Sequence, residues 1–153
     1  MKRKNDSELV SNRRAYHDYH ILETFEAGIA LQGTEVKSLK EHAGNLQDSY
    51  VTIEKNEVWL KSASIAPYKF GTAFNHEEKR DRKLLLHHYE IEKLKKLTEQ
   101  KGMTIVPLSI YLKKGLIKVK IATAKGKKTY DKRESIKERE QKRSIERALK
   151  QEK

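Results

Sequence analysis

The clearest alternation of hydrophobic and polar residues lies in the second half of the chain. Apolar Ile117, Val119 and Ile121 alternate there with Lys118 and Lys120. Because successive side chains of a β-strand point to opposite faces, this pattern predicts a strand with one apolar and one basic face.

Other segments complete the predicted strands. Two pairs of apolar segments flank short polar turns and predict hairpins: 49–53 with 58–60 around Lys55-Asn56, and 103–112 with 116–121 around Lys113-Lys114-Gly115. Tyr19–Phe25 is rich in aromatic and β-branched residues, which favour strands. It is expected to reach a turn at Ala27-Gly28, after which residues 29–32 resume the pattern.

Two segments repeat apolar residues every three or four positions and therefore predict amphipathic helices. The first is expected at 34–43, with Thr34 as its N-cap and Gly44 as its stop signal. The second is expected at 88–101, where Ile91, Leu94 and Leu97 share one face.

The order of these elements predicts the fold class. A loop is expected at residues 67–83 because of Pro67, Gly71 and the charged cluster 77–83, whereas the short apolar run Leu84-Leu85-Leu86 fits neither period. Roughly six short strands with two or three embedded helices over residues 13–124 predict a mainly β protein, either a compact barrel or a half-open antiparallel sheet, of which the OB-fold-like antiparallel β-barrel is the partly open form. Barrels of this kind frequently bind oligonucleotides.

Both ends of the chain are basic. Residues 125–153 hold 12 Lys or Arg against 6 Asp or Glu, which is +6 of the net charge of +12. Few of them are apolar, so alone they are expected to form a disordered tail. Arg139, Arg143 and Arg147 share one helical stripe, which favours a helix once the tail binds a polyanion. Residues 1–12 are expected to be a flexible basic N-terminus.

Several classes of site find no support in the sequence. The chain has no cysteine. Gly28 and Gly33 have the spacing of a phosphate-binding loop, but Thr34-Glu35 follows where Lys-Ser/Thr is needed. The six histidines lack the spacing of metal ligands. We therefore expect no cofactor, no metal and no catalytic residue, and an RNA-processing enzyme is kept as a lesser alternative.

Membrane association is not expected either. No apolar run approaches the ~20 residues of a membrane span, and no apolar segment follows the basic N-terminus as in a secretory signal. The sequence predicts a cytoplasmic protein.

Five blocks of the sequence resemble one known family. They are Asn12-Arg13-Arg14-Ala15-x-His17-Asp18-Tyr19, 25–39, Asn45-Leu46-x-Asp48-Ser49-Tyr50, 82–86 and Lys125-Gly126-Lys127-Lys128-x-Tyr130-Asp131-Lys132-Arg133. These blocks are similar to those of the SsrA-binding proteins of bacteria, the small protein B family. The similarity runs from about Asn12 to the C-terminus in the family's order.

This resemblance implies a function. Members bind the tRNA-like domain of tmRNA through an OB-like barrel and accompany that RNA to stalled ribosomes in trans-translation. The basic tail becomes helical in the empty mRNA channel, against rRNA of the small subunit. The resemblance further implies an adaptor without enzymatic activity, which meets elongation factor Tu together with alanyl-tmRNA. We expect it to be a monomer.

The resemblance also implies residues of the RNA-binding site. Glu26, Leu85 and Lys118 correspond to family residues needed for tmRNA binding. Lys118 is expected to pair with a phosphate, and Glu26 either to accept a hydrogen bond from the RNA or to order a neighbouring cation. For Leu85, an RNA contact and a core position are both open.

Residue type adds three candidates to this site. Lys120 shares the basic face of the predicted strand with Lys118, and cations lined along a strand suit a phosphate backbone. Arg13 and His17 belong to a basic and aromatic stretch that suits unpaired bases.

The tail supplies the residues expected to contact the ribosome. These are Lys125, Lys127, Lys128, Tyr130, Asp131, Lys132, Arg133, Arg139, Arg143 and Arg147. Asp131-Lys132-Arg133 matches the family segment near the decoding centre. Tyr130 stands where some members have His, so stacking is kept and the imidazolium charge is lost. A general RNA-binding or ribosome-associated OB protein is the alternative that the charge alone allows.

Overall fold

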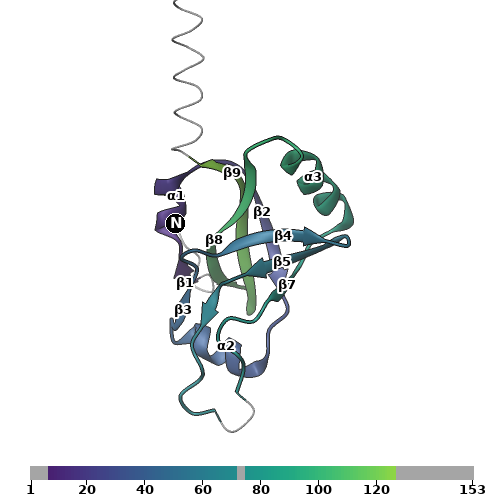
Figure 1. Ribbon diagram of the computed structural model, residues 1–153. Coiled ribbons are helices and arrows are strands. Elements are labelled where there is room, and N and C mark those ends of the chain that lie inside the picture. The colour runs from purple at the N-terminus through teal and green to yellow at the C-terminus, as the bar shows by residue number, and fades with distance from the viewer. Residues whose placement is uncertain (1–6, 72–74, 127–153) are drawn as a thin grey trace, which may run out of the picture.

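The computed structural model describes residues 7–71 and 75–126, which form nine strands and three helices (Figure 1). The strands are β1 Ser7–Ser11, β2 Tyr19–Ile29, β3 Gly44–Asn45, β4 Tyr50–Glu54, β5 Glu57–Lys61, β6 Ser64–Ile65, β7 Arg82–Leu85, β8 Met103–Lys113 and β9 Leu116–Gly126. The helices are α1 Arg13–Asp18, α2 Gly33–Lys40 and α3 His88–Thr98.

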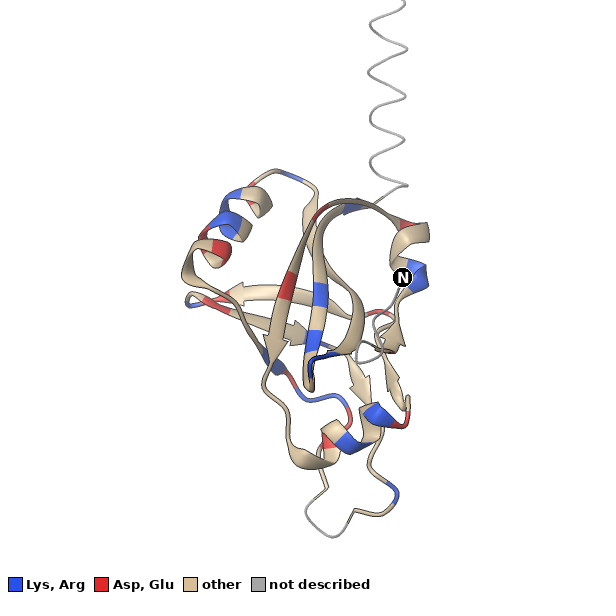
Figure 2. Cartoon of the chain, turned by 180° about the vertical axis from the view of Figure 1, so that it is seen from behind, with Lys and Arg blue, Asp and Glu red and all other residues tan. Residues whose placement is uncertain are grey.

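The predicted mainly β fold with an antiparallel barrel is confirmed. Seven strands form one antiparallel sheet in the order β1-β8-β4-β5-β7-β2-β9, and pairing of β8 with β9 closes it into a barrel. Strands β3 and β6 form a separate small sheet. In both Figures 1 and 2, α2 lies at one end of the barrel, whereas α1 and the end of β9 lie at the other.

Both predicted hairpins are present and use the tight turns that their sequences favour. Lys55 and Asn56 link β4 to β5 with φ angles of 50° and 64°, and Lys114 and Gly115 link β8 to β9 with φ angles of 50° and 79°. A two-residue turn with both φ angles positive has a backbone twist that matches the right-handed twist of the paired strands.

The alternation that predicted the last strand is confirmed in β9. Val119 and Ile121 are completely buried in the core, whereas Lys120 is exposed and Lys118 is half-buried. The burial of the apolar side chains therefore fixes which face of the strand carries the lysines.

The predicted turn at Ala27-Gly28 is wrong, because β2 continues to Ile29. Ala27 is completely buried, and Gly28 pairs with Lys118 of β9 and with Leu85 of β7. A Cβ atom on Gly28 would lie 3.3 Å from the Leu85 Cβ atom. This glycine marks a close approach between strands rather than a turn.

The predicted flexible N-terminus is wrong for residues 7–12. Strand β1 pairs with β8, and Leu9 and Val10 are buried. Asn12 is also buried, and its Nδ2 donates a hydrogen bond to the Pro107 carbonyl oxygen at 2.8 Å. The barrel unit therefore begins before residue 13 and extends to Gly126 of β9. Residues 1–6 lie outside the described residues.

Both predicted helices are present with shifted bounds. Helix α2 begins at Gly33 with Gln32 as N-cap instead of Thr34, because the Glu35 carboxylate accepts the Gln32 backbone N–H at 2.8 Å. It ends at Lys40 rather than at residue 43. Helix α3 ends at Thr98, and its predicted apolar face is confirmed, since Leu94 is completely buried.

The predicted loop at 67–83 ends two residues early, because Arg82 begins β7. Arg82 is completely buried, and its Nε donates to a Glu35 carboxylate oxygen at 2.5 Å. Its two terminal nitrogens donate to four backbone carbonyl oxygens, those of Ala63, Arg80, Glu77 and Glu78, at 2.9–3.3 Å. Every N–H group of this buried guanidinium therefore has an acceptor.

The Glu35 carboxylate likewise has several hydrogen-bond donors. Besides Arg82 and the Gln32 backbone, it accepts hydrogen bonds from Arg80 Nη2 at 2.5 Å and Nε at 3.1 Å. Burial raises the pKa of Glu35, but the bonds from Arg80, the Gln32 backbone and Arg82 outweigh it and hold the pKa below the ordinary 4.5. Glu35 is therefore an ionised link between α2 and the start of β7.

Replacing Glu35 with Gln should lower the free energy of unfolding by about 3–5 kcal/mol, because Arg82 would keep a buried charge without its counter-charge. Urea denaturation measures this loss. Glu57→Gln is the matched control, since the half-exposed Glu57 carboxylate lies 3.4 Å from Lys83 Nζ and should contribute less than about 1 kcal/mol.

The pH dependence sharpens the same test. Since the folded pKa of Glu35 is depressed, its stabilisation is complete above the unfolded value near 4.5 and is lost as the pH falls through the folded value. The stability difference between the native protein and Glu35→Gln should therefore shrink in acid. A small, pH-independent difference would contradict the assigned ion pair.

Candidate nucleic-acid interface

Four of the predicted RNA-binding residues meet on one outer face of the barrel. Glu26 of β2 pairs with Lys120 of β9, and two residues further along Gly28 pairs with Lys118 and with Leu85 of β7. Residues paired directly across antiparallel strands point to the same face. Figure 2 shows the result, an acidic position on β2 beside basic positions on β9. We call Glu26, Leu85, Lys118 and Lys120 the central face.

Glu26 accepts hydrogen bonds from two residues of β8. The Tyr111 hydroxyl donates a hydrogen bond to its carboxylate, and Lys113 Nζ lies 3.2 Å from the same oxygen. The Tyr111 hydrogen bond, followed by those from Lys113 and the charge of Lys118, holds the pKa of Glu26 below its ordinary value. Glu26 is thus ionised at neutral pH and holds one neighbouring cation, Lys113, which corresponds to one of its two predicted roles.

Lys118 and Lys120 add positive charge to the central face. Within the described part of the chain, neither ammonium group takes part in a salt bridge. Three lysines of this face, Lys113 included, stand against two carboxylates, that of Glu26 and that of Glu90, which lines a hollow beside it. The surplus of positive charge suits a phosphate backbone, where each contact releases condensed counterions.

Leu85 is a surface residue and not part of the core. It is 53% exposed, whereas its neighbour Leu84 is 2% exposed. Leu85 borders a hollow of about 360 Å³ whose lining includes Glu26, Lys118 and His87. The open question about Leu85 is therefore settled in favour of a surface position, which leaves its apolar side chain available to a ligand.

An aromatic pair stands beside this hollow. The rings of His87 and Tyr89 are stacked, with centroids 5.5 Å apart and planes 9° apart, and Tyr89 is 70% exposed. Stacked rings at a surface offer a platform for an unpaired base. His87 also lines the hollow, so the platform continues the central face towards α3.

Sequence reasoning missed four residues of this face: Tyr111, Lys113, His87 and Tyr89. Tyr111 and Lys113 sit two positions apart, and Tyr111 pairs with Lys118, so the strand register identifies them. The sequence carries a partial signal in the Tyr-x-Lys spacing next to the turn, but it does not show that both side chains reach Glu26.

Arg13 and His17 do not join the central face. Both are on α1, which precedes Tyr19, and Tyr19 pairs with Gly126 near the end of β9. The seven residues from Tyr19 to Glu26 span about 20 Å of strand. Lys125 pairs with His20 and therefore lies at the α1 end as well. The other predicted tail residues, from Lys127 onward, lie outside the described residues.

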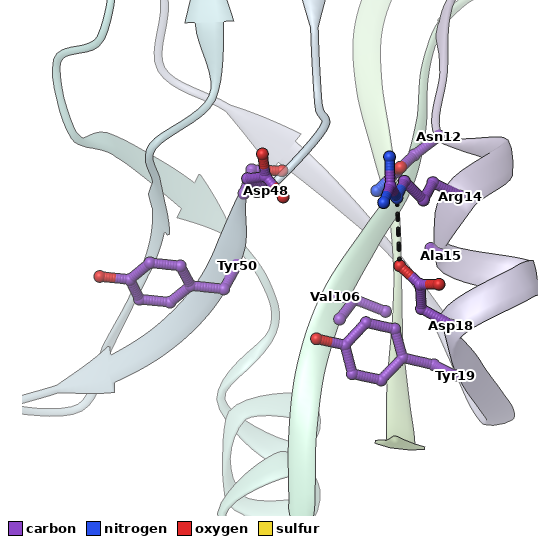
Figure 3. A pocket seen from close by; sticks show the side chains of 9 residues that line it. Asn12, Arg14, Ala15, Asp18, Tyr19, Asp48, Tyr50 and Val106 are labelled. Atoms are coloured by element: carbon purple, nitrogen blue, oxygen red, sulfur yellow. Dashed lines mark hydrogen bonds and ion pairs between the residues drawn. The ribbon is translucent and has the colours of Figure 1, made fainter. Parts of the chain in front are cut away.

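A second hollow, of about 340 Å³, opens between α1 and the residues before β4 (Figure 3). Arg14 and Asp18 face each other on one side, with Nε and Oδ2 3.4 Å apart, and Asp48 and Tyr50 lie on the other. A hydrogen bond from His17, followed by the charge of Arg14, holds the pKa of Asp18 below its ordinary value. Two carboxylates against one guanidinium make this hollow a poor site for phosphate.

Two further observations concern other kinds of site. Within residues 7–71 and 75–126, no group of three or more His, Asp or Glu side chains is arranged to hold a metal ion. Over the same ranges, no helix has the length and apolar character needed to cross a membrane.

Comparison with known proteins adds independent information. The profile of the SmpB protein family matches residues 9–151. The SsrA-binding protein of Protochlamydia amoebophila (strain UWE25) is 60% identical over 151 residues, which cover 99% of this chain and 98% of that protein. The SsrA-binding protein of Chlamydia trachomatis serovar A is 59% identical over 143 residues, covering 94% of this chain and 95% of that protein.

A solved structure is also similar. It is described as "tmRNA-SmpB: a journey to the center of the bacterial ribosome" and has a TM-score of 0.66 and 50% sequence identity. The match covers 76% of this chain and 82% of the chain in that structure.

The hydrogen bond from Tyr111 yields a test of the central face. Tyr111→Phe should raise the pKa of Glu26 towards its ordinary value of 4.5, because the strongest group holding it down is removed. Carboxyl carbon shifts in an NMR titration measure this pKa. Tyr50→Phe is the control, since Tyr50 lies on β4 away from Glu26. An unchanged titration of Glu26 in Tyr111→Phe would show that this bond does not form.

Proposed function

Because this chain belongs to the SmpB protein family, we propose that it binds tmRNA, the SsrA RNA, and acts in trans-translation as the adaptor that brings this RNA to stalled ribosomes. The relatives named SsrA-binding protein match it over nearly its full length. The observation that carries the proposal is the central face, where Lys118 and Lys120, which form no salt bridge within the described residues, lie beside an ordered carboxylate and an exposed leucine.

The central face binds the tRNA-like domain through three kinds of contact. Lys118 and Lys120 pair with backbone phosphates, which position the RNA without reading its sequence. Leu85 packs against a sugar or an unstacked base, and the His87–Tyr89 pair extends this apolar surface. Glu26 keeps Lys113 in place, so that this cation is ordered before the RNA arrives.

In this proposal the tail that follows the barrel binds the ribosome. Strand β9 ends at Gly126, at the α1 end of the barrel, which is opposite to α2. The basic residues of the tail then contact rRNA of the small subunit at the decoding centre and in the empty mRNA channel. Charge supports this assignment, since residues 125–153 carry +6. Arg13 and His17 at the same end are placed to assist them.

The remaining parts of the proposal follow from the same role. The protein is an RNA-binding adaptor rather than an enzyme, and peptidyl transfer is left to the ribosome. It acts in the cytoplasm as a monomer, and it meets elongation factor Tu through the alanyl-tmRNA that both proteins bind.

Lys118→Ala should weaken tmRNA binding and lower the slope of log affinity against log salt concentration by about 1, because one phosphate contact is lost. Filter binding across a salt series measures both quantities. Lys101→Ala is the charge-matched control, since Lys101 is exposed and lies about 30 Å along the β8–β9 hairpin from Lys118. Identical slopes for all three proteins would rule out a phosphate contact at Lys118.

A chain that ends at Lys128 should bind tmRNA with near-native affinity but should not support tagging of a nascent peptide on a stalled ribosome. The physical reason is the separation of the central face from the end of β9. RNA binding and tagging are measured on the same preparation in a reconstituted system. Loss of both activities to the same degree would refute the division between barrel and tail.

A further inference from the structure

An aromatic side chain is exposed at the α2 end of the barrel, outside both of the hollows described above. Phe70 is 71% exposed, more than any other large apolar side chain of the described residues. It lies in the segment 67–71, which leaves the barrel after β6 on the side of α2 (Figure 1). A single exposed ring is ordinary at a protein surface, so the residues around Phe70 decide whether it marks an interaction site.

The segment that carries Phe70 is held by its own hydrogen bonds. Asn75 accepts the Tyr68 backbone N–H at 3.2 Å and donates to the Tyr68 carbonyl oxygen at 2.8 Å, and that oxygen also accepts the Gly71 N–H at 2.8 Å. The next residue, His76, is buried and contacts the Thr34 hydroxyl of α2 at 2.8 Å. These hydrogen bonds hold the backbone around Phe70 in one conformation, which lowers the entropic cost of binding a ligand there.

Cations surround the aromatic residues. Lys69 Nζ lies 5.2 Å from the Phe70 ring centroid, and Lys37 Nζ of α2 lies 5.6 Å from the Tyr68 ring centroid. The rings of Tyr68 and Phe70 meet edge to face with centroids 5.6 Å apart. Aromatic faces beside ammonium groups are the composition with which proteins bind unpaired nucleotides.

The charge of α2 points to the same kind of ligand. Its one acidic residue, Glu35, is buried and neutralised by the two arginines, so on the outer side Lys37 and Lys40 outnumber the single exposed carboxylate of Glu41, the C-cap residue. Within the described residues, Lys37, Lys40 and Lys69 form no salt bridge. These three lysines together with Tyr68 and Phe70 are called the α2 patch.

The α2 patch continues from the central face. Strand β2 carries Glu26 and Gly28 and ends at Ile29, and α2 begins at Gly33. Arg80 bridges this connection, because its Nη2 donates to the Ala30 carbonyl oxygen at 3.2 Å while it also binds Glu35. The α2 patch therefore lies beyond the Gly28 end of β2, at the end of the barrel opposite to α1.

We infer that the α2 patch is a second contact for tmRNA, at which an unpaired base stacks on Phe70 and flanking phosphates pair with Lys37, Lys40 and Lys69. The inference rests on the proposed function in taking tmRNA as the ligand. It adds a site that reads an unstacked nucleotide, whereas the central face binds mainly phosphates.

Phe70→Ala tests the stacking contact directly. Affinity for full-length tmRNA should fall about tenfold, as expected for the loss of one stacked base, and Phe70→Tyr should restore it because a tyrosine ring stacks equally well. Native affinity in Phe70→Ala, or a Tyr variant as weak as the Ala variant, would overturn the inference. Circular dichroism of each variant verifies that the barrel is intact.

A crosslinking experiment identifies the ligand. Benzoylphenylalanine at position 70 should crosslink to a nucleotide of tmRNA in the two-component complex and in the stalled-ribosome complex. Crosslinks confined to rRNA or to a protein would contradict the inference.

Lys118→Ala, measured in parallel, distinguishes a failure of the α2 patch from a failure of the proposed tmRNA binding. If Lys118→Ala weakens binding and Phe70→Ala does not, the α2 patch is refuted and the proposed function stands. If tmRNA does not bind the native protein, the proposed function itself fails.

Discussion

The buried pair of Glu35 and Arg82 is the interaction on which the rest of the structure depends. Arg82 donates to Glu35 and to four backbone carbonyl oxygens, and Glu35 also fixes the start of α2. Such a pair adds little net stability compared with apolar residues, but breaking it leaves a charge buried without a partner. It therefore acts chiefly by allowing one arrangement of α2, of the connection that follows β6, and of β7.

The position of β7 in turn determines the central face. With Arg82 buried at its start, β7 points Leu84 into the core and Leu85 outward against Gly28. Strand β2 then lies between β7 and β9, which places Leu85, Glu26 and the two lysines on one surface. A slip of one residue in β9 would turn Lys118 and Lys120 inward and Val119 and Ile121 outward, so the apolar core protects the register of the binding face.

The errors of prediction have definite physical causes. Residues 7–11 contain too few apolar residues to predict a strand alone, and β1 exists because the edge of β8 supplies its partner. Gly28 suggested a turn, yet it is needed where Leu85 approaches β2. Tyr111 and Lys113 were missed because β8 is apolar for most of its length, and only pairing with β9 shows that their side chains reach Glu26.

The sequence by itself determined what depends on neighbouring residues along the chain. The alternation in β9, both hairpin turns, the apolar stripe of α3 and the charge of the ends follow from local periodicity and composition, and motif resemblance indicated the family. Only the tertiary structure decided what depends on contacts distant in sequence. It made Glu35 a buried partner of Arg82, brought Leu85 to the surface beside Glu26, and separated α1 from the central face. Strand register and burial set these positions, and no local pattern encodes either of them.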